Sequence, residues 1–162
     1  MATLVAPATP ARADVRDPYA HKYLIAIAVT LAAGTTTGVV SAVLLARLFG
    51  GGPVLVASVA PKSVTAPIAM GVSREIGGLP ELTAVVVIAT GVAGAILVTP
   101  LMDALGIRDW RARGFAAGLA AHGIGTARAL QVNPVAGTFA GLALALNGLV
   151  TALVAPLLFR LV

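Results

Sequence analysis

The sequence predicts an all-α integral membrane protein with three full transmembrane helices and two broken or re-entrant helical segments. Of its 162 residues, 59% are hydrophobic and only 10% are charged, and the mean hydropathy is +0.99. A soluble domain carries about 25% charged residues, so this composition indicates lipid as the solvent. Aromatic residues are scarce, and small residues such as glycine are abundant, which suits closely packed transmembrane helices.

The charge pattern excludes several classes of function. The net charge is +5, but no run of Lys and Arg carries interleaved aromatic residues, so we expect a lipid bilayer as partner and no nucleic acid. The chain has no cysteine, hence no disulfide, thiol nucleophile or Cys-based metal site. Hydrolytic triads, phosphate-binding glycine loops and metal-ligand clusters are also missing from the sequence. We therefore expect neither an enzyme nor a bound cofactor or metal.

The first 22 residues differ from the rest of the chain. They contain three prolines and spread-out charges. The "ARA" at 11–13 resembles a signal-peptidase site, but the segment lacks a positive start and a continuous apolar core. We interpret 1–22 as a polar cytoplasmic tail.

A single membrane domain is expected over 23–162. Three apolar stretches, 23–48, 82–105 and 137–161, are long enough to cross a hydrocarbon core of about 30 Å. Between them, 54–73 and 114–130 are apolar at the ends and polar or rich in Gly and Pro in the middle. Irregular backbone is tolerated at membrane depth only inside protein or beside a watery cavity. Two interrupted segments in corresponding positions of two halves indicate a transporter binding site.

The order of break and span is repeated, and the two spans resemble each other weakly. When 86–105 is aligned with 142–161, six of twenty positions are identical, including Pro100 with Pro156. If each interrupted segment re-enters on its own side, the two units enter from opposite faces as an inverted repeat. If each crosses instead, the repeat is not inverted.

Basic residues bear on this choice without deciding it. In the re-entrant topology, six lie inside (Arg12, Arg16, Lys22, Arg108, Arg111, Arg113) and three outside (Arg47, Arg74, Arg160). This agrees with the positive-inside rule, whereas a crossing topology puts 108–113 outside. Roughly 20 residues at 1.5 Å each make only a short hairpin, however. Both topologies stay open from sequence alone.

The first interrupted segment carries a lysine between two helix-breaking prolines. Lys62 lies between Pro61 and Pro67, with Ser63 and Thr65 beside it. Its amine either snorkels to the interface or binds an anion within the membrane. The hydroxyls and the partial positive charge at the N-terminus of a half-helix favour an anion such as a carboxylate.

The second interrupted segment, "AAHGIGTARA", offers a histidine and an arginine. His122 is either a packing residue or a substrate or proton-coupling group, and Gly123 and Gly125 give its backbone freedom. Arg128 is either an interfacial anchor or a second positive group that holds a carboxylate with two hydrogen bonds.

Polar residues within the long spans suggest helix packing. Asn147 lies in the middle of a span, where we expect it to form hydrogen bonds between helices. We expect the three threonines at 35–37, between Gly34 and Gly38, to bond their own helix and mark close packing.

The stretches "APKSVTAPIAMGVSREIGG" and "ARGFAAGLAAHGIGTARAL" resemble the hallmark motifs of the LrgB/CidB family of bacterial membrane proteins. The resemblance covers residue 23 to the C-terminus and implies a multi-pass protein of the bacterial inner (plasma) membrane. It implies either a secondary carrier of small monocarboxylates such as pyruvate, glycolate or glycerate, or an antiholin-like regulator. The regulator would control murein hydrolase export and cell lysis through a small LrgA/CidA-type membrane partner. The motifs place functional weight on Pro61, Lys62, Ser63, Thr65, Pro67, His122, Gly123, Gly125, Thr126 and Arg128.

Members of that family usually carry further spans before the equivalent of Tyr23. Here only "LVAPATPARA" echoes the end of such a stretch. The chain is therefore expected to be a shortened member, to have a misplaced start, or to draw helices from a second subunit. We expect a homo-oligomer, or a complex with the small partner, that covers the Gly34/Gly38 face. Of the two functions, carriage of a small monocarboxylate is the one we expect.

Overall fold

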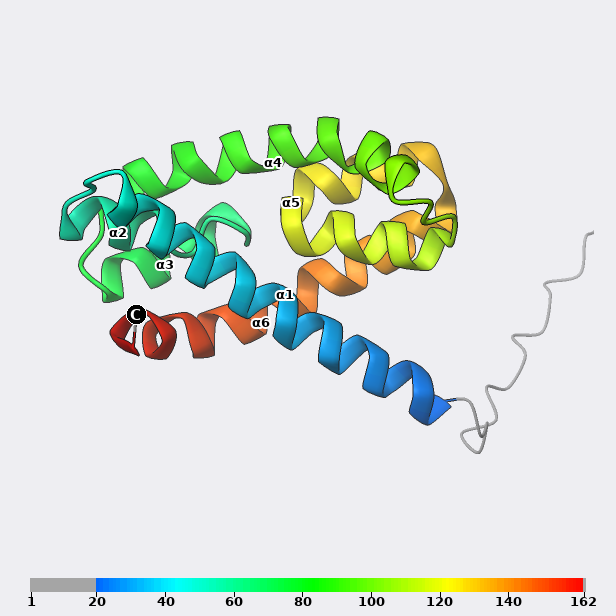
Figure 1. Ribbon diagram of the computed structural model, residues 1–162, viewed down its shortest axis with the longest axis horizontal. Helices are drawn as coiled ribbons and strands as arrows, with labels where there is room; N and C mark the ends of the chain where they lie inside the picture. Colours follow the sequence, from blue (N-terminus) through cyan, green and yellow to red (C-terminus); the bar gives the residue numbers. More distant parts are fainter. Residues whose placement is uncertain (1–19, 162) are drawn as a thin grey trace, which may run out of the picture.

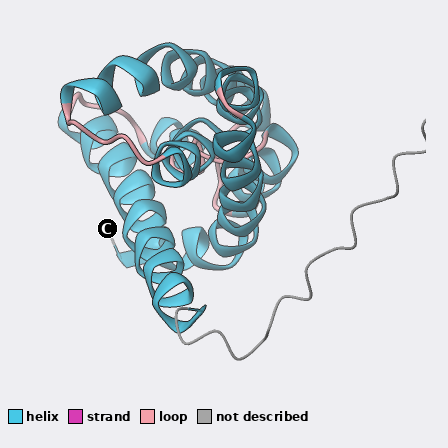
Figure 2. Ribbon diagram, turned by 90° about the vertical axis from the view of Figure 1, so that its right-hand side faces the viewer, coloured by secondary structure: helices cyan, strands magenta, loops and turns pink. Residues whose placement is uncertain are grey.

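In a computed structural model of the chain, which describes residues 20–161, the protein consists of six helices joined by short loops (Figures 1 and 2). The helices are α1 (Ala20–Leu48), α2 (Pro53–Val59), α3 (Ala66–Glu75), α4 (Pro80–Ala104), α5 (Trp110–Val132) and α6 (Pro134–Leu161). No strand occurs in this range, which confirms the all-α prediction. Most of the predicted tail, with Arg12 and Arg16, lies outside the described residues.

Three of the helices, α1, α4 and α6, are long and apolar enough to cross a membrane. They correspond to the predicted spans 23–48, 82–105 and 137–161, each within about one helical turn at either end. At 1.5 Å per residue, the 25 residues of α4 reach about 37 Å, more than the hydrocarbon core of about 30 Å. The prediction of three full spans is therefore confirmed.

The first interrupted segment is a hairpin whose two arms, α2 and α3, both end beside the start of α4. The Ser58 hydroxyl of α2 accepts a hydrogen bond from the Leu79 backbone N–H at 2.8 Å. The Thr83 hydroxyl of α4 lies 2.9 Å from the Ser58 carbonyl oxygen and 2.7 Å from Ser73 Oγ of α3. Because Ser58, Ser73 and Thr83 are buried, these bonds fix both arms to one end of α4.

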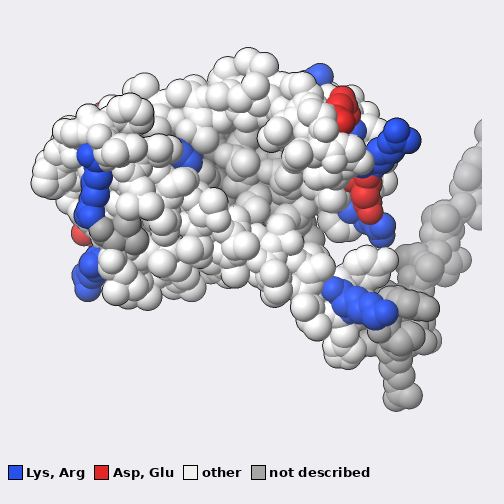
Figure 3. All heavy atoms as spheres, viewed as in Figure 1, with Lys and Arg blue, Asp and Glu red and all other residues white. Residues whose placement is uncertain are grey.

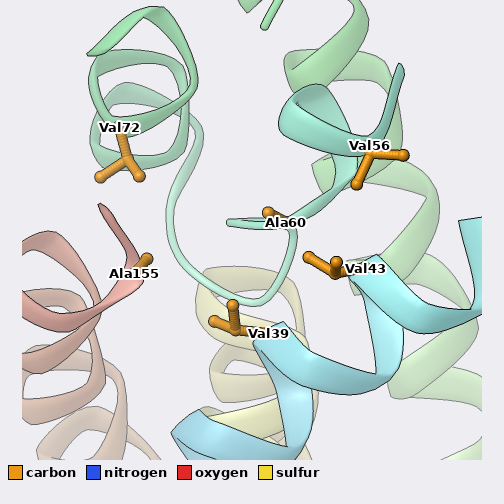
Figure 4. Close-up of a cluster of buried hydrophobic side chains, with 6 residues drawn as sticks. All are labelled: Val39, Val43, Val56, Ala60, Val72 and Ala155. Atoms are coloured by element: carbon orange, nitrogen blue, oxygen red, sulfur yellow. The ribbon is translucent and has the colours of Figure 1, made fainter. Parts of the chain in front are cut away.

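A buried apolar cluster seats this hairpin between α1 and α6. Its members come from four helices and the loop at the hairpin tip, and they point toward one another: Val39, Val43, Val56, Ala60, Val72 and Ala155 (Figure 4). Alanines in the loop and in α6 let the backbones approach closely. The tip of the hairpin therefore reaches the middle of the long helices.

The second interrupted segment, α5, is folded back on itself. Its backbone leaves helical geometry at Ala121 and His122, so its two halves form a second hairpin. A Cβ at Gly114, near the start of α5, would meet the Ala136 backbone, and one at Gly137 would meet Leu130 near the end of α5. Both arms therefore pack against the beginning of α6.

These contacts show the re-entrant topology. The beginning of α1 and both ends of α5 lie at one end of the molecule, which we call the basic end, and the α2–α3 hairpin enters from the opposite end (Figure 1). The unit α2–α3–α4 and the unit α5–α6 thus repeat the order hairpin then span, from opposite sides. This is the inverted arrangement that the sequence left open.

Charged residues gather at the two ends of the molecule and leave its sides mostly uncharged (Figure 3). The basic end carries the cations of α1, α5 and the loop before α5: Lys22, Arg108, Arg111, Arg113 and Arg128. The opposite end carries Arg47, Arg74 and Arg160. At the basic end Asp109 caps α5, and hydrogen bonds from the Arg111 side chain and backbone lower its pKa to about 2.

The arrangement makes a prediction about sidedness, and the lack of native cysteine makes it testable. Single cysteines at the exposed residues Ala112 and Val132 are expected to react with an impermeant maleimide from the same face, the cytoplasmic one. A cysteine in place of Glu75 is the control and should react from the other face. Labelling of 112 and 132 from opposite faces would exclude the hairpin.

Candidate functional site

A groove of about 840 Å³ lies between α1 and α4, and the tips of the two hairpins form part of its wall. Its lining residues are mostly small or hydroxyl-bearing, with one cation among them: Val29, Thr30, Ala33, Gly34, Thr37, Gly38, Lys62, Ser63, Thr90, Ala93, Gly94, Leu119 and Ala120. Figure 3 shows this face of the molecule hollowed between α4 and α1.

Lys62 is the charged group of the groove. It lies in the loop between α2 and α3, half-buried, with Nζ 3.3 Å from Ser63 Oγ. Among residues 20–161 the ion pairs involve Arg111 and Arg113, and no carboxylate pairs with Lys62. A lysine at the centre of a bilayer costs about 3 kcal/mol to insert. An uncompensated cation at this depth is therefore suited to an anion that comes from outside this part of the chain.

Glycines bring the hairpin tips close to the groove walls. A Cβ at Gly38 of α1 would lie 3.5 Å from Ser63 Oγ, and one at Gly34 would meet the Leu119 side chain. A larger side chain at Gly34 would therefore force Leu119 to move. These glycines thus mark close packing, as expected, and they also line the groove. Thr35 does not bond its own helix as expected, because its hydroxyl donates to Asn147 of α6.

Asn147, buried in the middle of α6, joins both hairpins. Its Nδ2 donates to the Ser63 carbonyl oxygen at 3.0 Å and to the Leu119 carbonyl oxygen at 3.1 Å. Its Oδ1 accepts from the Thr35 hydroxyl at 2.7 Å and from the Thr151 hydroxyl at 3.2 Å. One side chain thus connects α1, α6 and the two tips, which is the kind of interhelical bonding expected of it.

His122, at the tip of the second hairpin, packs against α4 and lies outside the groove lining. It is buried, and its Nε2 lies 2.9 Å from the Val87 carbonyl oxygen. Because a carbonyl only accepts, Nε2 carries the proton of this hydrogen bond. The ring fits only because residue 91 is glycine, since a Cβ there would lie 2.6 Å from the imidazole Cε1.

The backbone at His122 has φ 41° and ψ −131°, and no other non-glycine residue of the described range has positive φ. A side chain in this region is strained by about 1–2 kcal/mol. The strain is held in place by the Val87 hydrogen bond and by burial against Gly91. Strained, buried residues of this kind gather at functional sites.

The two hairpins are interlocked through equivalent positions of the repeated spans. When Val86 is aligned with Leu142, Gly91 of α4 matches Asn147 of α6. Gly91 receives the tip of the second hairpin, and Asn147 receives the tip of the first. Each hairpin therefore contacts the span of the other unit as well as its own.

The other residues predicted in the first hairpin have structural positions. Pro61 is buried in the loop, and Thr65 is the extended residue before α3. Pro67 lies in the first turn of α3, where proline starts a helix and does not end one. Neither Thr65 nor Pro67 lines the groove.

In the second hairpin, the predicted residues mostly support the fold. Gly123 is exposed, and Gly125 allows the two arms to meet at the Ala117 carbonyl. The Thr126 hydroxyl donates to the His122 carbonyl oxygen at 2.8 Å. Arg128 lies at the basic end, beside Arg113 and away from Lys62, because the hairpin returns there. The structure therefore does not bring Arg128 and Lys62 together around one ligand.

Sequence reasoning did not assign Thr37, Thr90 or Leu119 to the groove. The run of threonines beside Gly34 and Gly38 was visible, but the sequence does not show which side of that helix faces the hairpin tips. Within residues 20–161, no group of three His, Asp or Glu side chains is placed to hold a metal ion.

The chain is similar to proteins of one family. Residues 17–161 match the model of the LrgB-like family. An uncharacterized protein of Haemophilus influenzae is 41% identical over 119 residues, which cover 74% of this chain and 52% of that protein. The holin-like protein CidB of Staphylococcus epidermidis is 31% identical over 140 residues, covering 86% of this chain and 61% of CidB.

A plant relative extends the comparison. The plastidal glycolate/glycerate translocator 1 of Arabidopsis thaliana is 40% identical over 116 residues, covering 71% of this chain and 23% of the translocator. The match to the two bacterial relatives above thus spans between half and two thirds of their lengths. No solved structure matches.

The strained tip makes a prediction about stability. Replacing His122 by Ala removes the imidazole and keeps the strain, whereas His122→Gly removes both. We expect His122→Gly to be more stable than His122→Ala by about 1 kcal/mol. Glycine relieves the backbone strain at this position, and this gain exceeds the extra conformational entropy that glycine loses on folding. The measurement is unfolding of the purified protein in mixed detergent.

Gly123→Ala in the neighbouring position is the matched control, because no atom lies within 4 Å of a Cβ built there and its φ is ordinary. It should stabilise the protein by about 0.5–1 kcal/mol, the ordinary advantage of alanine over glycine in an unstrained helix. A glycine variant at 122 that is less stable than the alanine variant would contradict the strained backbone.

Proposed function

We propose, from the premise that the chain belongs to the LrgB-like family, that this multi-pass membrane protein carries small monocarboxylates as a secondary carrier. The substrate class is that of pyruvate, glycolate and glycerate. The site is the groove between α1 and α4.

The proposal rests on the position and charge of Lys62. It is a half-buried cation at a helix break, with no carboxylate to neutralise it among residues 20–161. A substrate carboxylate would supply the missing negative charge beside the Lys62 Nζ. It would also accept a hydrogen bond from the Ser63 hydroxyl, whose oxygen lies 3.3 Å from Nζ. The hydroxyls of Thr37 and Thr90, from opposite walls, suit the remaining oxygen atoms of a hydroxy or keto acid.

The dimensions of the groove suit binding together with water. Its volume of about 840 Å³ falls within the range of about 300–1,000 Å³ usual for ligand sites. A two- or three-carbon acid fills only part of this space. The substrate would therefore keep some of its hydration, which favours release as well as binding.

The interlocked hairpins support alternating access. Two units inserted from opposite faces, with a site at their junction, are the usual basis of secondary transport. Here the tips meet at Asn147, and Lys62 lies in one of them. A small movement of one unit against the other would change the face to which Lys62 is open.

The name of one relative favours carriage, and the name of another favours a holin-like role. The plant translocator is named for glycolate and glycerate, and CidB is named holin-like. A lytic regulator acting with a small membrane partner, or as a homo-oligomer, predicts leakage without saturation. Transport measurements separate the two functions.

The proposal predicts the transport phenotype of Lys62. Removing one partner of a buried charge interaction costs about 2–5 kcal/mol, which reduces affinity by well over tenfold. Lys62→Ala should therefore abolish saturable uptake and counterflow of labelled glycolate and pyruvate in proteoliposomes. Lys62→Arg keeps the charge and should retain part of the uptake.

Arg74→Ala removes an exposed cation at the end of α3 and is the matched control, with uptake like the parent. Parent-like uptake by Lys62→Ala would show that Lys62 is an interfacial anchor. Uptake by the parent that does not saturate would favour the holin-like function.

A further inference from the structure

Two arginines that are distant in the sequence meet at the basic end of the molecule. Arg113, near the start of α5, and Arg128, near its end, line one small hollow together with Thr99 and Trp110. They meet because α5 folds back at His122 and both of its arms return to the end of α4. The hollow is separate from the Lys62 groove, with which it shares no residue.

Arg113 is held firmly in the hollow. Its Nη2 donates to Asp103 Oδ1 at 2.6 Å and to the Thr99 carbonyl oxygen at 3.2 Å, and its guanidinium lies 5.0 Å from the centre of the Trp110 ring. The Arg113 side chain is 13% exposed, and that of Asp103 is 61% exposed. The neutralising carboxylate thus faces water, outside the more buried part of the hollow.

Arg128 adds a second positive charge and has no acidic partner among residues 20–161. It is exposed at the mouth of the hollow. Two guanidinium groups with one carboxylate leave a net positive site. Guanidinium groups bind phosphate oxygens with paired hydrogen bonds, which a more strongly hydrated ammonium does less well.

The position of the hollow corresponds to the headgroup layer. Trp110 is half-exposed beyond the end of the α4 span, and tryptophan is enriched at this level of a membrane. The remaining walls are apolar and face along the helices: Val98, Ala117, Ala129, Val132 and Ala136. The volume of about 20 Å³ holds about one water-sized group, so a phosphate would lie at the mouth of the hollow with one oxygen directed inward. An acyl chain would instead follow the apolar outer surface.

We propose that Arg113, Arg128 and Trp110 form a binding site for the phosphate group of an anionic phospholipid. Basic pockets between transmembrane helices bind such headgroups. A bound phosphate would bridge the start and the end of the second hairpin, and so hold its two arms together at the membrane surface. The inference is independent of what the groove binds.

The single tryptophan of the chain makes the site measurable. Trp110 fluorescence reports on the hollow directly, because the sequence has no other tryptophan. The protein is placed in vesicles of phosphatidylglycerol and phosphatidylcholine at a fixed ratio, with bromine, a quencher, on one lipid or the other. Brominated phosphatidylglycerol should quench Trp110 as though enriched about fivefold over phosphatidylcholine.

Two variants distinguish a built site from general attraction. Arg128→Gln should reduce the enrichment to less than about twofold. Arg108→Gln removes the same charge from the loop at the same end, outside the hollow, and should keep most of the enrichment. No enrichment in the parent, or an equal loss in both variants, would overturn the proposal.

The alternative ligand for the two arginines is a soluble phosphate ion, and adding inorganic phosphate tests it. At constant ionic strength, added phosphate should leave the quenching by brominated phosphatidylglycerol unchanged. If phosphate relieves that quenching in the parent but not in Arg128→Gln, the hollow binds a soluble anion and the lipid assignment is wrong.

Discussion

The carboxamide of Asn147 is the interaction on which the rest of the structure depends. A helix that breaks inside a membrane leaves carbonyl groups without partners, and lipid cannot satisfy them. Asn147 donates to two such carbonyls, those of Ser63 and Leu119, one from each hairpin. The hydroxyls of Thr35 and Thr151 bond its oxygen and fix the orientation of the amide. Single bonds of this kind contribute only about 0.6–2 kcal/mol in membranes, but here four share one side chain.

Close packing and the groove follow from this arrangement. Because the tips are drawn to the middle of α6, the facing positions of α1 and α4 must be small, and Gly34, Gly38, Gly91 and Gly94 meet that need. Gly34, Gly38 and Gly94 also leave space beside the tips, and this space is the groove that Lys62 lines. A recess at membrane depth thus lies beside the two hairpin tips whose broken backbone Asn147 satisfies.

Much of the fold was predictable because its signals are local. Continuous apolar stretches identified α1, α4 and α6, and prolines and glycines identified both breaks. Lys62 was conspicuous because charge is rare in such spans. The location of Arg128 was not predictable, since it depends on α5 folding back at His122. Sequence patterns alone could not decide whether that segment crosses.

The partners of Asn147 were also hidden from the sequence. They include the backbone carbonyls of Ser63 and Leu119, which any residue type supplies. The role of Thr37 in the groove wall was missed for a related reason. Three consecutive threonines point in different directions around a helix, and only tertiary contacts show that Thr35 faces Asn147 while Thr37 faces the groove.

The most direct test of this account is the rate of disulfide formation between cysteines placed at Gly38 and Ser63. A Cβ at Gly38 would lie 3.9 Å from the Ser63 Cβ, close to the usual disulfide separation of about 3.8 Å. With no other cysteine in the chain, any intramolecular bond reports the position of the first hairpin tip. The account predicts rapid cross-linking in membranes that slows several-fold when Asn147 is replaced by Leu. No cross-link, or an equal rate with and without Asn147, would contradict the claim that this side chain holds the hairpins at the centre of the protein.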